Sequence, residues 1–243
     1  MKSRLDMLLL TRNLAESRQK AQALIVAGQV FVNGHRADKA GSQFQTDCDI
    51  EIKGDKCPYV SRGGLKLAAG LDHFAIDPEG FICADIGAST GGFSDCLLQR
   101  GAIRVYAVDV GYGQLAWKLR QDERVVVMER TNARHLASGD IPEKLDLAVI
   151  DASFISLELL LKPLLNFLKP GGRILALIKP QFEVGKGQVG KGGVVRDPEL
   201  HESSTRKIEE FGRTLGLDCL GVTPSPVLGP KGNREFLIYF AVP

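Results

Sequence analysis

The sequence lacks a long apolar run, has few cysteines and carries almost no net charge. A typical apolar run, residues 174–178, lies between an arginine and a lysine, whereas a membrane-spanning helix needs about 18 apolar residues. The five cysteines are odd in number and form no CxxC pair, which argues against disulfides and favours reduced thiols in the cytoplasm. The first 13 residues have only a short apolar stretch and no small-residue cleavage site, so we expect no secretory signal and no stable membrane association.

The composition is that of a folded protein with an uneven distribution of charge. The chain has 243 residues, 44% of them hydrophobic, and a formal charge of +2, which excludes disorder because a core can offset chain entropy. Residues 1–39 contain seven basic and three acidic side chains, a net charge of +4, while the remaining 204 residues sum to −2. A positive amino-terminal segment suits a polyanionic partner such as nucleic acid.

Residues 1–53 have the pattern of a small α+β module. Leucines at positions 5, 8 and 9 predict one helix, and residues 17–27 predict a second helix that ends at Gly28. A short strand is expected at residues 30–32, followed by an Asn33-Gly34 hairpin turn and a further strand at residues 49–53.

The basic residues of this module have two interpretations. They could form an ordinary solvated helix face. However, the ordered pattern of Arg4, Leu5, Asp6, Ser17, Arg18, Ala21, Leu24, Ile25, Gly28, Val30, Val32, Asn33 and Gly34 resembles the S-four-like (alpha-L) RNA-binding domain. The resemblance implies that Arg4, Arg18 and Lys20 bind RNA phosphates. We expect this domain to span residues 1–60, with a linker at about residues 53–61.

The rest of the chain alternates between strands and helices. A helix at residues 63–74 precedes apolar strands at 81–86, 105–110, 125–128, 145–150, 174–178 and 236–242. Near-continuous apolar strands separated by helices predict an α/β domain, residues 61–243, with a mostly parallel sheet covered on both faces. Such sheets bind ligands beyond the carboxyl ends of their strands.

The first of these strands leads into a glycine-rich turn, and acidic or amide side chains follow the next two strands. The turn contains Asp85, Gly87, Ser89, Gly91 and Phe93, and Asp109 and Asn132 come later. Ser89 replaces the second glycine of a dinucleotide-binding motif, so a nucleoside without pyrophosphate fits better. Turn chemistry and helix capping are the alternative. The arrangement resembles the S-adenosylmethionine site of class I methyltransferases, which have a Rossmann-like seven-stranded sheet. The expected cofactor-binding residues are Asp85, Gly87, Ser89, Gly91, Phe93, Asp109, Asn132 and Asp151.

Charged residues also stand at the ends of two central strands, Asp151 and Lys179. A salt bridge at the rim of the sheet would explain them. Together with Lys66 and Glu235, however, they resemble the Lys-Asp-Lys-Glu catalytic tetrad of FtsJ-type ribose 2'-O-methyltransferases. The segments SRGGLKL, DIGASTGGFSD, IDASFISL, LIKPQFEVG and GNREFLIYF are similar to those of the TlyA family, which joins the two domain types.

The TlyA resemblance implies S-adenosylmethionine-dependent methylation of a ribose 2'-hydroxyl in ribosomal RNA, at cytidine, with rRNA or ribosomal subunits as partner. It assigns the role of general base to Lys179, but the residues alone do not show whether Lys179 or Lys66 has this role. No metal is required by this chemistry and no ligand spacing suggests one.

Two alternatives belong to other classes of function. One is a membrane-active haemolysin, a name also attached to the TlyA family, and the other is an RNA-binding ribosome-assembly factor without catalysis. The stretch at residues 185–193 nearly matches a phosphate-binding loop, but Gly192 stands where Ser or Thr must hold magnesium. We interpret this stretch as a basic lid or an ordinary solvent loop.

Overall fold

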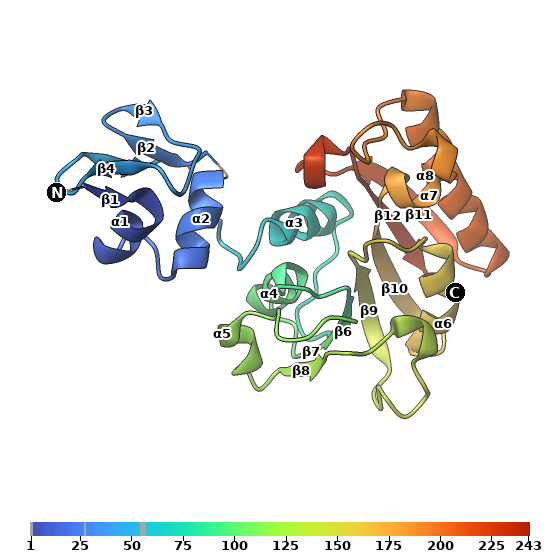
Figure 1. The fold of residues 1–243 in the computed structure, drawn as a ribbon. Coiled ribbons are helices and arrows are strands. Elements are labelled where there is room, and N and C mark those ends of the chain that lie inside the picture. Colours follow the sequence, from blue (N-terminus) through green and yellow to red (C-terminus); the bar gives the residue numbers. More distant parts are fainter. Residues whose placement is uncertain (1, 27, 54–56) are drawn as a thin grey trace. The chain divides into compact units, whose positions relative to one another are not determined.

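A computed structural model describes residues 2–26, 28–53 and 57–243 (Figure 1). These residues form two compact units, divided between residues 56 and 57. The predicted boundary at about residue 60 stays a prediction, and residues 54–56 of the predicted linker lie outside the described residues.

The amino-terminal unit packs two helices against short strands. Its elements are β1 (Lys2–Arg4), α1 (Leu5–Thr11), α2 (Arg18–Val26), β2 (Val30–Val32), β3 (His35–Arg36), β4 (Gln43–Gln45) and β5 (Ile50–Ile52). The second predicted helix is present over residues 18–26, and residue 27 lies outside the described residues. Asn33 and Gly34 have φ values of 50° and 77°, which is the left-handed backbone that a tight hairpin between β2 and β3 requires.

The core of this unit consists of the apolar residues that recur at helical spacing in the sequence. Leu5 and Leu9 of α1 are fully buried, as are Ala21 and Ile25 of α2. They belong to one cluster with Val30 and other residues of the short strands. The amphipathic pattern of the sequence therefore fixes how α1 and α2 pack.

The carboxy-terminal unit is an α/β domain around a seven-stranded sheet. Its strands are β6 (Ile82–Ile86), β7 (Arg104–Val108), β8 (Val125–Met128), β9 (Leu145–Ile150), β10 (Leu168–Ile178), β11 (Asp218–Pro224) and β12 (Phe236–Ala241). The α-helices are α3 (Gly63–His73), α4 (Gly92–Gln99), α5 (Trp117–Arg120), α6 (Glu158–Leu164), α7 (Pro180–Glu183) and α8 (Pro198–Thr214). The short 3-10 helices are η1 (Ala133–His135), η2 (Lys186–Gln188) and η3 (Pro230–Gly232).

The strand order is β11-β12-β10-β9-β6-β7-β8, and the pairs from β10 to β8 are parallel. Strand β12 is antiparallel to both of its neighbours, β10 and β11. Its first residues therefore lie at the sheet edge where the parallel strands end.

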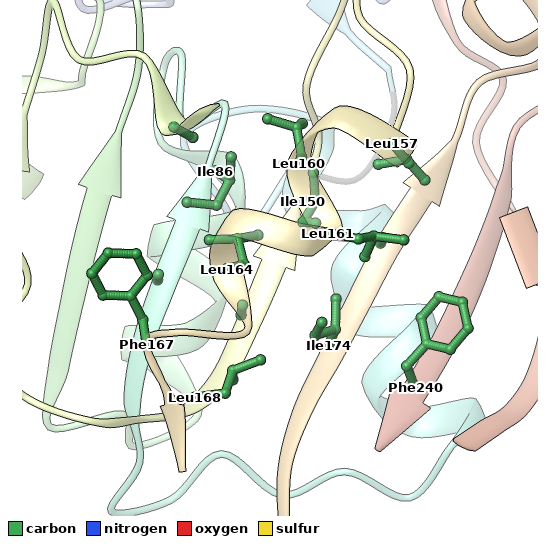
Figure 2. Packing of buried hydrophobic residues seen from close by; sticks show 14 of the residues in the cluster. Ile86, Ile150, Leu157, Leu160, Leu161, Leu164, Phe167, Leu168, Ile174 and Phe240 are labelled. Carbon is green, nitrogen blue, oxygen red and sulfur yellow. The ribbon is translucent and has the colours of Figure 1, made fainter. Parts of the chain in front are cut away.

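Helices cover both faces of the sheet, as the apolar strands predict. Along β9, Ala148 and Ile150 belong to one core cluster and Leu147 and Val149 to the other, because successive side chains point to opposite faces. Figure 2 shows the first cluster, in which Leu160, Leu161 and Leu164 of α6 pack over Ile150 and Ile174. Helices α3 and α4 cover the opposite face (Figure 1).

In the seven-stranded sheet, β10 and β11 differ most from the sequence-based expectation, and in the amino-terminal unit β1 and β4 were not predicted. Strand β10 begins at Leu168 rather than at residue 174, with a register irregularity between Leu168 and Arg173. Strand β11 was not predicted, because its sequence, DCLGVTP, contains a glycine and ends in proline, and neither residue is favoured in strands. Its position at the edge of the sheet tolerates both residues.

Candidate active site

Two adjoining cavities open at the edge of the sheet where the parallel strands end. The first has a volume of about 440 Å³ and the second about 480 Å³. Both are lined by Gly87, Ser89, Asp151 and Ser153, so together they form a continuous site around the glycine-rich turn after β6. This is the position that the strand alternation predicts for a ligand.

The first charged pair at this edge is Lys179 with Asp151. Lys179 follows β10 and Asp151 follows β9, and the parallel pairing of these strands brings the two side chains together. The Lys179 Nζ lies 2.6 Å from the Asp151 Oδ1 and 2.9 Å from the Ser153 Oγ, to which it donates. It also donates to the Asp151 carbonyl at 3.3 Å. Lys179 thus makes two hydrogen bonds and one close ion-pair contact, and the Asp151 Oδ1 has no hydrogen-bond partner among the described residues.

The second pair, Lys66 with Glu235, joins segments that are 169 residues apart in the chain. Lys66 lies on α3, and Glu235 directly precedes β12, whose reversed direction brings the carboxylate to this edge. The Lys66 Nζ donates to the Glu235 Oε2 at 2.6 Å, and the two residues are 8% and 1% exposed. A Cβ on Gly229 would lie 1.9 Å from the Glu235 Oε1, so only glycine lets the backbone cover this carboxylate.

The structure brings together the four residues of the predicted tetrad as these two pairs. Lys66, Asp151 and Lys179 line the first cavity, while Glu235 lies beneath Lys66 and does not line it. Ion pairs that are taken out of water bring little net stabilisation. The two lysine–carboxylate pairs are therefore better explained by a functional role than by a contribution to stability.

Asp85 presents an unsatisfied oxygen at the first cavity. Its Oδ2 accepts hydrogen bonds from the Ser94 amide at 2.9 Å and the Ser94 hydroxyl at 2.7 Å, while its Oδ1 has no hydrogen-bond partner among the described residues. Burial raises the pKa of Asp85 to about 7; the Ser94 hydrogen bonds oppose the shift, and the charges of Asp151 and Asp109 add to it. A cation in the cavity would satisfy the free oxygen and favour the charged form.

The second cavity contains the other predicted cofactor residues. Asp109 accepts hydrogen bonds from the amides of Ser89 at 2.8 Å and Gly111 at 2.6 Å. Asn132 accepts one from the Arg134 amide at 3.1 Å and so caps η1. The turn-and-cap interpretation therefore describes part of their role, but both residues also line the cavity, and carboxylate oxygens keep lone pairs for further donors.

The glycines of the turn are required by close backbone approach. Gly87 has a φ of 85°, and a Cβ there would lie 2.9 Å from the Ala152 Cα and from the Asp151 carbonyl oxygen. Gly91 has a φ of 93° and packs against leucine side chains. Phe93 is 2% exposed and lines the first cavity from the start of α4. The Gly87 and Gly91 positions of the turn therefore accept only glycine.

Comparison with known proteins identifies the family. Residues 59–242 match the FtsJ-like methyltransferase family and residues 3–47 match the S4 domain. A protein of Mycobacterium tuberculosis named 16S/23S rRNA (cytidine-2'-O)-methyltransferase TlyA is 48% identical over 239 residues, which cover 98% of this chain and 89% of that protein. The chain belongs to the TlyA family of FtsJ-like methyltransferases.

Two further TlyA-like relatives cover almost the whole chain. YqxC of Bacillus subtilis, described as an rRNA methyltransferase candidate, is 51% identical over 243 residues, 100% of this chain and 86% of that protein. A solved structure from Streptococcus thermophilus, described as a hemolysin candidate, is 45% identical with a TM-score of 0.80, and covers 99% of this chain and 88% of that one. None of the helices in the described ranges is long and apolar enough to cross a membrane.

The three residues that the TlyA resemblance assigns to RNA lie in the S4 domain. Arg4 ends β1 and Arg18 begins α2, and both make ion pairs with Asp6 at 3.0 Å. Lys20 lies two residues further along the exposed start of α2, where its amide donates to the Ser17 hydroxyl at 3.2 Å. The structure brings Arg4 and Arg18 together, and their role in RNA binding stays a prediction.

Sequence reasoning missed Ser153, which lines both cavities, and Asn233, which is not among their lining residues. Ser153 bonds to Lys179, and its place two residues after Asp151 was the available signal. Asn233 is 3% exposed, donates to the Gly193 carbonyl at 3.0 Å and accepts from the Val195 amide at 3.1 Å. It thereby joins the end of the glycine-rich stretch to the segment before β12. The choice between a lid and a solvent loop for residues 185–193 stays open.

Proposed function

We propose that this chain methylates a ribose 2'-hydroxyl in ribosomal RNA, at cytidine, with S-adenosylmethionine as the methyl donor. The observation that carries the proposal is the pair of lysine–carboxylate contacts beside the glycine-rich turn. The name of the Mycobacterium tuberculosis relative supplies the base and the RNA class. The proposed catalytic residues are Lys66, Asp151, Lys179 and Glu235.

The residues of the site fit this cofactor. The free Asp85 Oδ1 is a buried acceptor that suits a positive group, and Gly87, whose backbone lies too close to Ala152 for a side chain, lines both cavities. Asp109 and Asn132 line the cavity that would hold the nucleoside end, with acceptors for ribose hydroxyls. When bound, S-adenosylmethionine supplies an electrophilic methyl group on a sulfonium. Asp85, Gly87, Ser89, Gly91, Phe93, Asp109, Asn132 and Asp151 are the proposed cofactor-binding residues.

A ribose hydroxyl is a weak nucleophile at neutral pH, so it must lose its proton as the methyl group is transferred. Lys179 is the proposed proton acceptor: in its neutral amine form it takes the proton of the hydroxyl and becomes the ammonium. Its amine is held in place by Asp151 and Ser153, and its contact to the Asp151 carbonyl, at 3.3 Å, is the longest of the three. A substrate hydroxyl can therefore replace the Asp151 carbonyl as a partner of the Lys179 nitrogen more easily than it can replace the other two contacts.

Lys66 contributes positive charge on the other side of the cavity. Glu235 holds its ammonium at a fixed position through the 2.6 Å contact, which leaves two N–H groups without a partner among the described residues. These donors can stabilise negative charge that develops on the ribose oxygen. The arrangement supports methyl transfer, whereas the haemolysin and assembly-factor alternatives leave the two pairs without a use.

The direct test is transfer of tritiated methyl groups from S-adenosylmethionine to ribosomal RNA and to isolated subunits, followed by nucleoside mapping. Lys179→Ala should reduce transfer by at least about 100-fold, the lower range for loss of a general base, while cofactor binding survives. Lys162→Ala, at an exposed position on α6, is the matched control and should keep full activity. Full activity in Lys179→Ala would contradict the proposed role.

A further inference from the structure

The S4 domain contains a buried carboxylate that contacts two arginines. Asp6, in the first turn of α1, is 0% exposed. Its Oδ1 accepts from the Arg4 Nε, and its Oδ2 accepts from the Arg4 Nη2 and the Arg18 Nε, all at 3.0 Å. The Gln22 amide nitrogen donates to the same Oδ2 at 3.1 Å. The carboxylate therefore joins β1, α1 and α2.

The two guanidinium groups keep donors directed away from Asp6. A guanidinium has five N–H groups, so Arg4, which uses two on Asp6, retains three, and Arg18, which uses one, retains four. These remaining groups have no partner among the described residues. The Arg4 and Arg18 side chains are 45% and 53% exposed. One part of each group is thus fixed to a buried acceptor, and the rest faces solvent.

The charge of this cluster exceeds what the fold needs. One arginine is enough to neutralise a buried carboxylate and to bond to both of its oxygens, as Arg4 does. Arg18 adds a second positive charge, which leaves the trio at +1 on a segment that is already positive. Hydrogen bonding from Arg4 lowers the pKa of Asp6 well below its usual range, with Gln22 and Arg18 adding to the effect against burial. Asp6 is therefore charged throughout the neutral range.

We infer that Asp6 is a positioning residue that holds Arg4 and Arg18 as a two-guanidinium site for the phosphates of bound RNA. The inference rests on the proposed function, since it takes RNA as the ligand of the S4 domain. Guanidinium forks match phosphate oxygens and bind them through paired hydrogen bonds. Asp6 fixes the two forks before RNA arrives, so that less side-chain entropy is lost on binding.

The test measures binding of the full chain to a fluorescein-labelled transcript of ribosomal RNA at two salt concentrations. Arg4→Lys and Arg18→Lys keep the charge but lose the fork, and each should weaken binding about tenfold, which corresponds to about 1.4 kcal/mol. Arg36→Lys makes the same change at an exposed position of β3 that makes no contact with Asp6, and should change affinity less than about twofold.

Asp6→Asn separates positioning from charge. The substitution removes one negative charge, so electrostatics alone would tighten binding to a polyanion. Loss of the positioning of Arg4 and Arg18 would instead weaken binding. Thermal unfolding of each variant shows whether it is folded. If Asp6→Asn is not folded, the affinities of the two lysine variants decide whether the inference stands. Unchanged affinity in both lysine variants, or tighter binding by folded Asp6→Asn, overturns the inference. Failure of the wild-type chain to bind the transcript would instead overturn the proposed function.

Discussion

Replacing Lys66 with methionine should destabilise the carboxy-terminal unit as well as abolish methyl transfer. The change leaves Glu235, which is 1% exposed, without the ammonium 2.6 Å away. Removing one partner of a buried ion pair costs about 3 to 5 kcal/mol. For a unit of this size, about 2 to 4 °C is lost per kcal/mol, so the melting temperature should fall by about 6 to 20 °C.

A second substitution distinguishes the cost of an unpaired charge from a packing defect. Lys66→Met combined with Glu235→Gln removes both charges, and glutamine has the shape that the close approach of Gly229 requires. The double variant should recover at least about half of the lost stability, because replacing a buried pair by neutral groups is often close to neutral. Methyl transfer should stay absent in both variants, since both lack the Lys66 ammonium.

The assays are thermal and urea unfolding, both followed by circular dichroism, and tritiated methyl transfer to ribosomal RNA. The surface pair Arg206–Glu202, with side chains 63% and 70% exposed, supplies the control, and Arg206→Met should cost less than about 1 kcal/mol. The reasoning is refuted if Lys66→Met unfolds within about 1 kcal/mol of the wild type, or if the double variant is no more stable than the single one.

Two further predictions concern the glycine-rich turn. Because burial raises the pKa of Asp85 to about 7, its contribution to stability is greatest below about pH 4 and is lost as the pH rises through 7. Between pH 5.5 and 7, calorimetry should show S-adenosylmethionine binding several-fold more tightly as Asp85 ionises. The uncharged 5'-methylthioadenosine should show no such dependence, and an equal dependence would exclude Asp85 as the cause. Gly87→Ala places a Cβ 2.9 Å from backbone atoms and should cost about 2 kcal/mol or more in urea unfolding; Gly113→Ala, where φ is also positive but no atom lies within 4 Å, should cost less, and equal losses would show that the close approach is unimportant.

The central sheet was predictable because buried parallel strands are apolar throughout. The expected strands at 125–128 and 145–150 match β8 and β9, and Asp151 and Lys179 were expected to pair from their places at neighbouring strand ends. The edge strand β11 was missed, since its stability comes from pairing with β12 rather than from its own residues.

Contacts that do not follow from neighbouring parallel strands were not accessible to reasoning from the residues alone. Nothing in the local pattern indicates that Lys66 contacts Glu235 across 169 residues, because that contact depends on the reversed direction of β12. The free oxygen of Asp85 and the double contact of Asp6 with Arg4 and Arg18 are likewise properties of packing. The sequence identifies the charged residues, and the tertiary structure decides which of them are neighbours.

The position of Glu235 just before β12 has a consequence for biosynthesis. Ribosomes make the chain from its amino terminus, so this carboxylate is the last of the four proposed catalytic groups to be synthesised. A product that stopped before residue 235 would leave Lys66 without its partner and one edge of β10 unpaired. Premature termination upstream of this point should therefore give no partial activity, and the enzyme can begin to modify RNA only after translation has passed through residues 235–241.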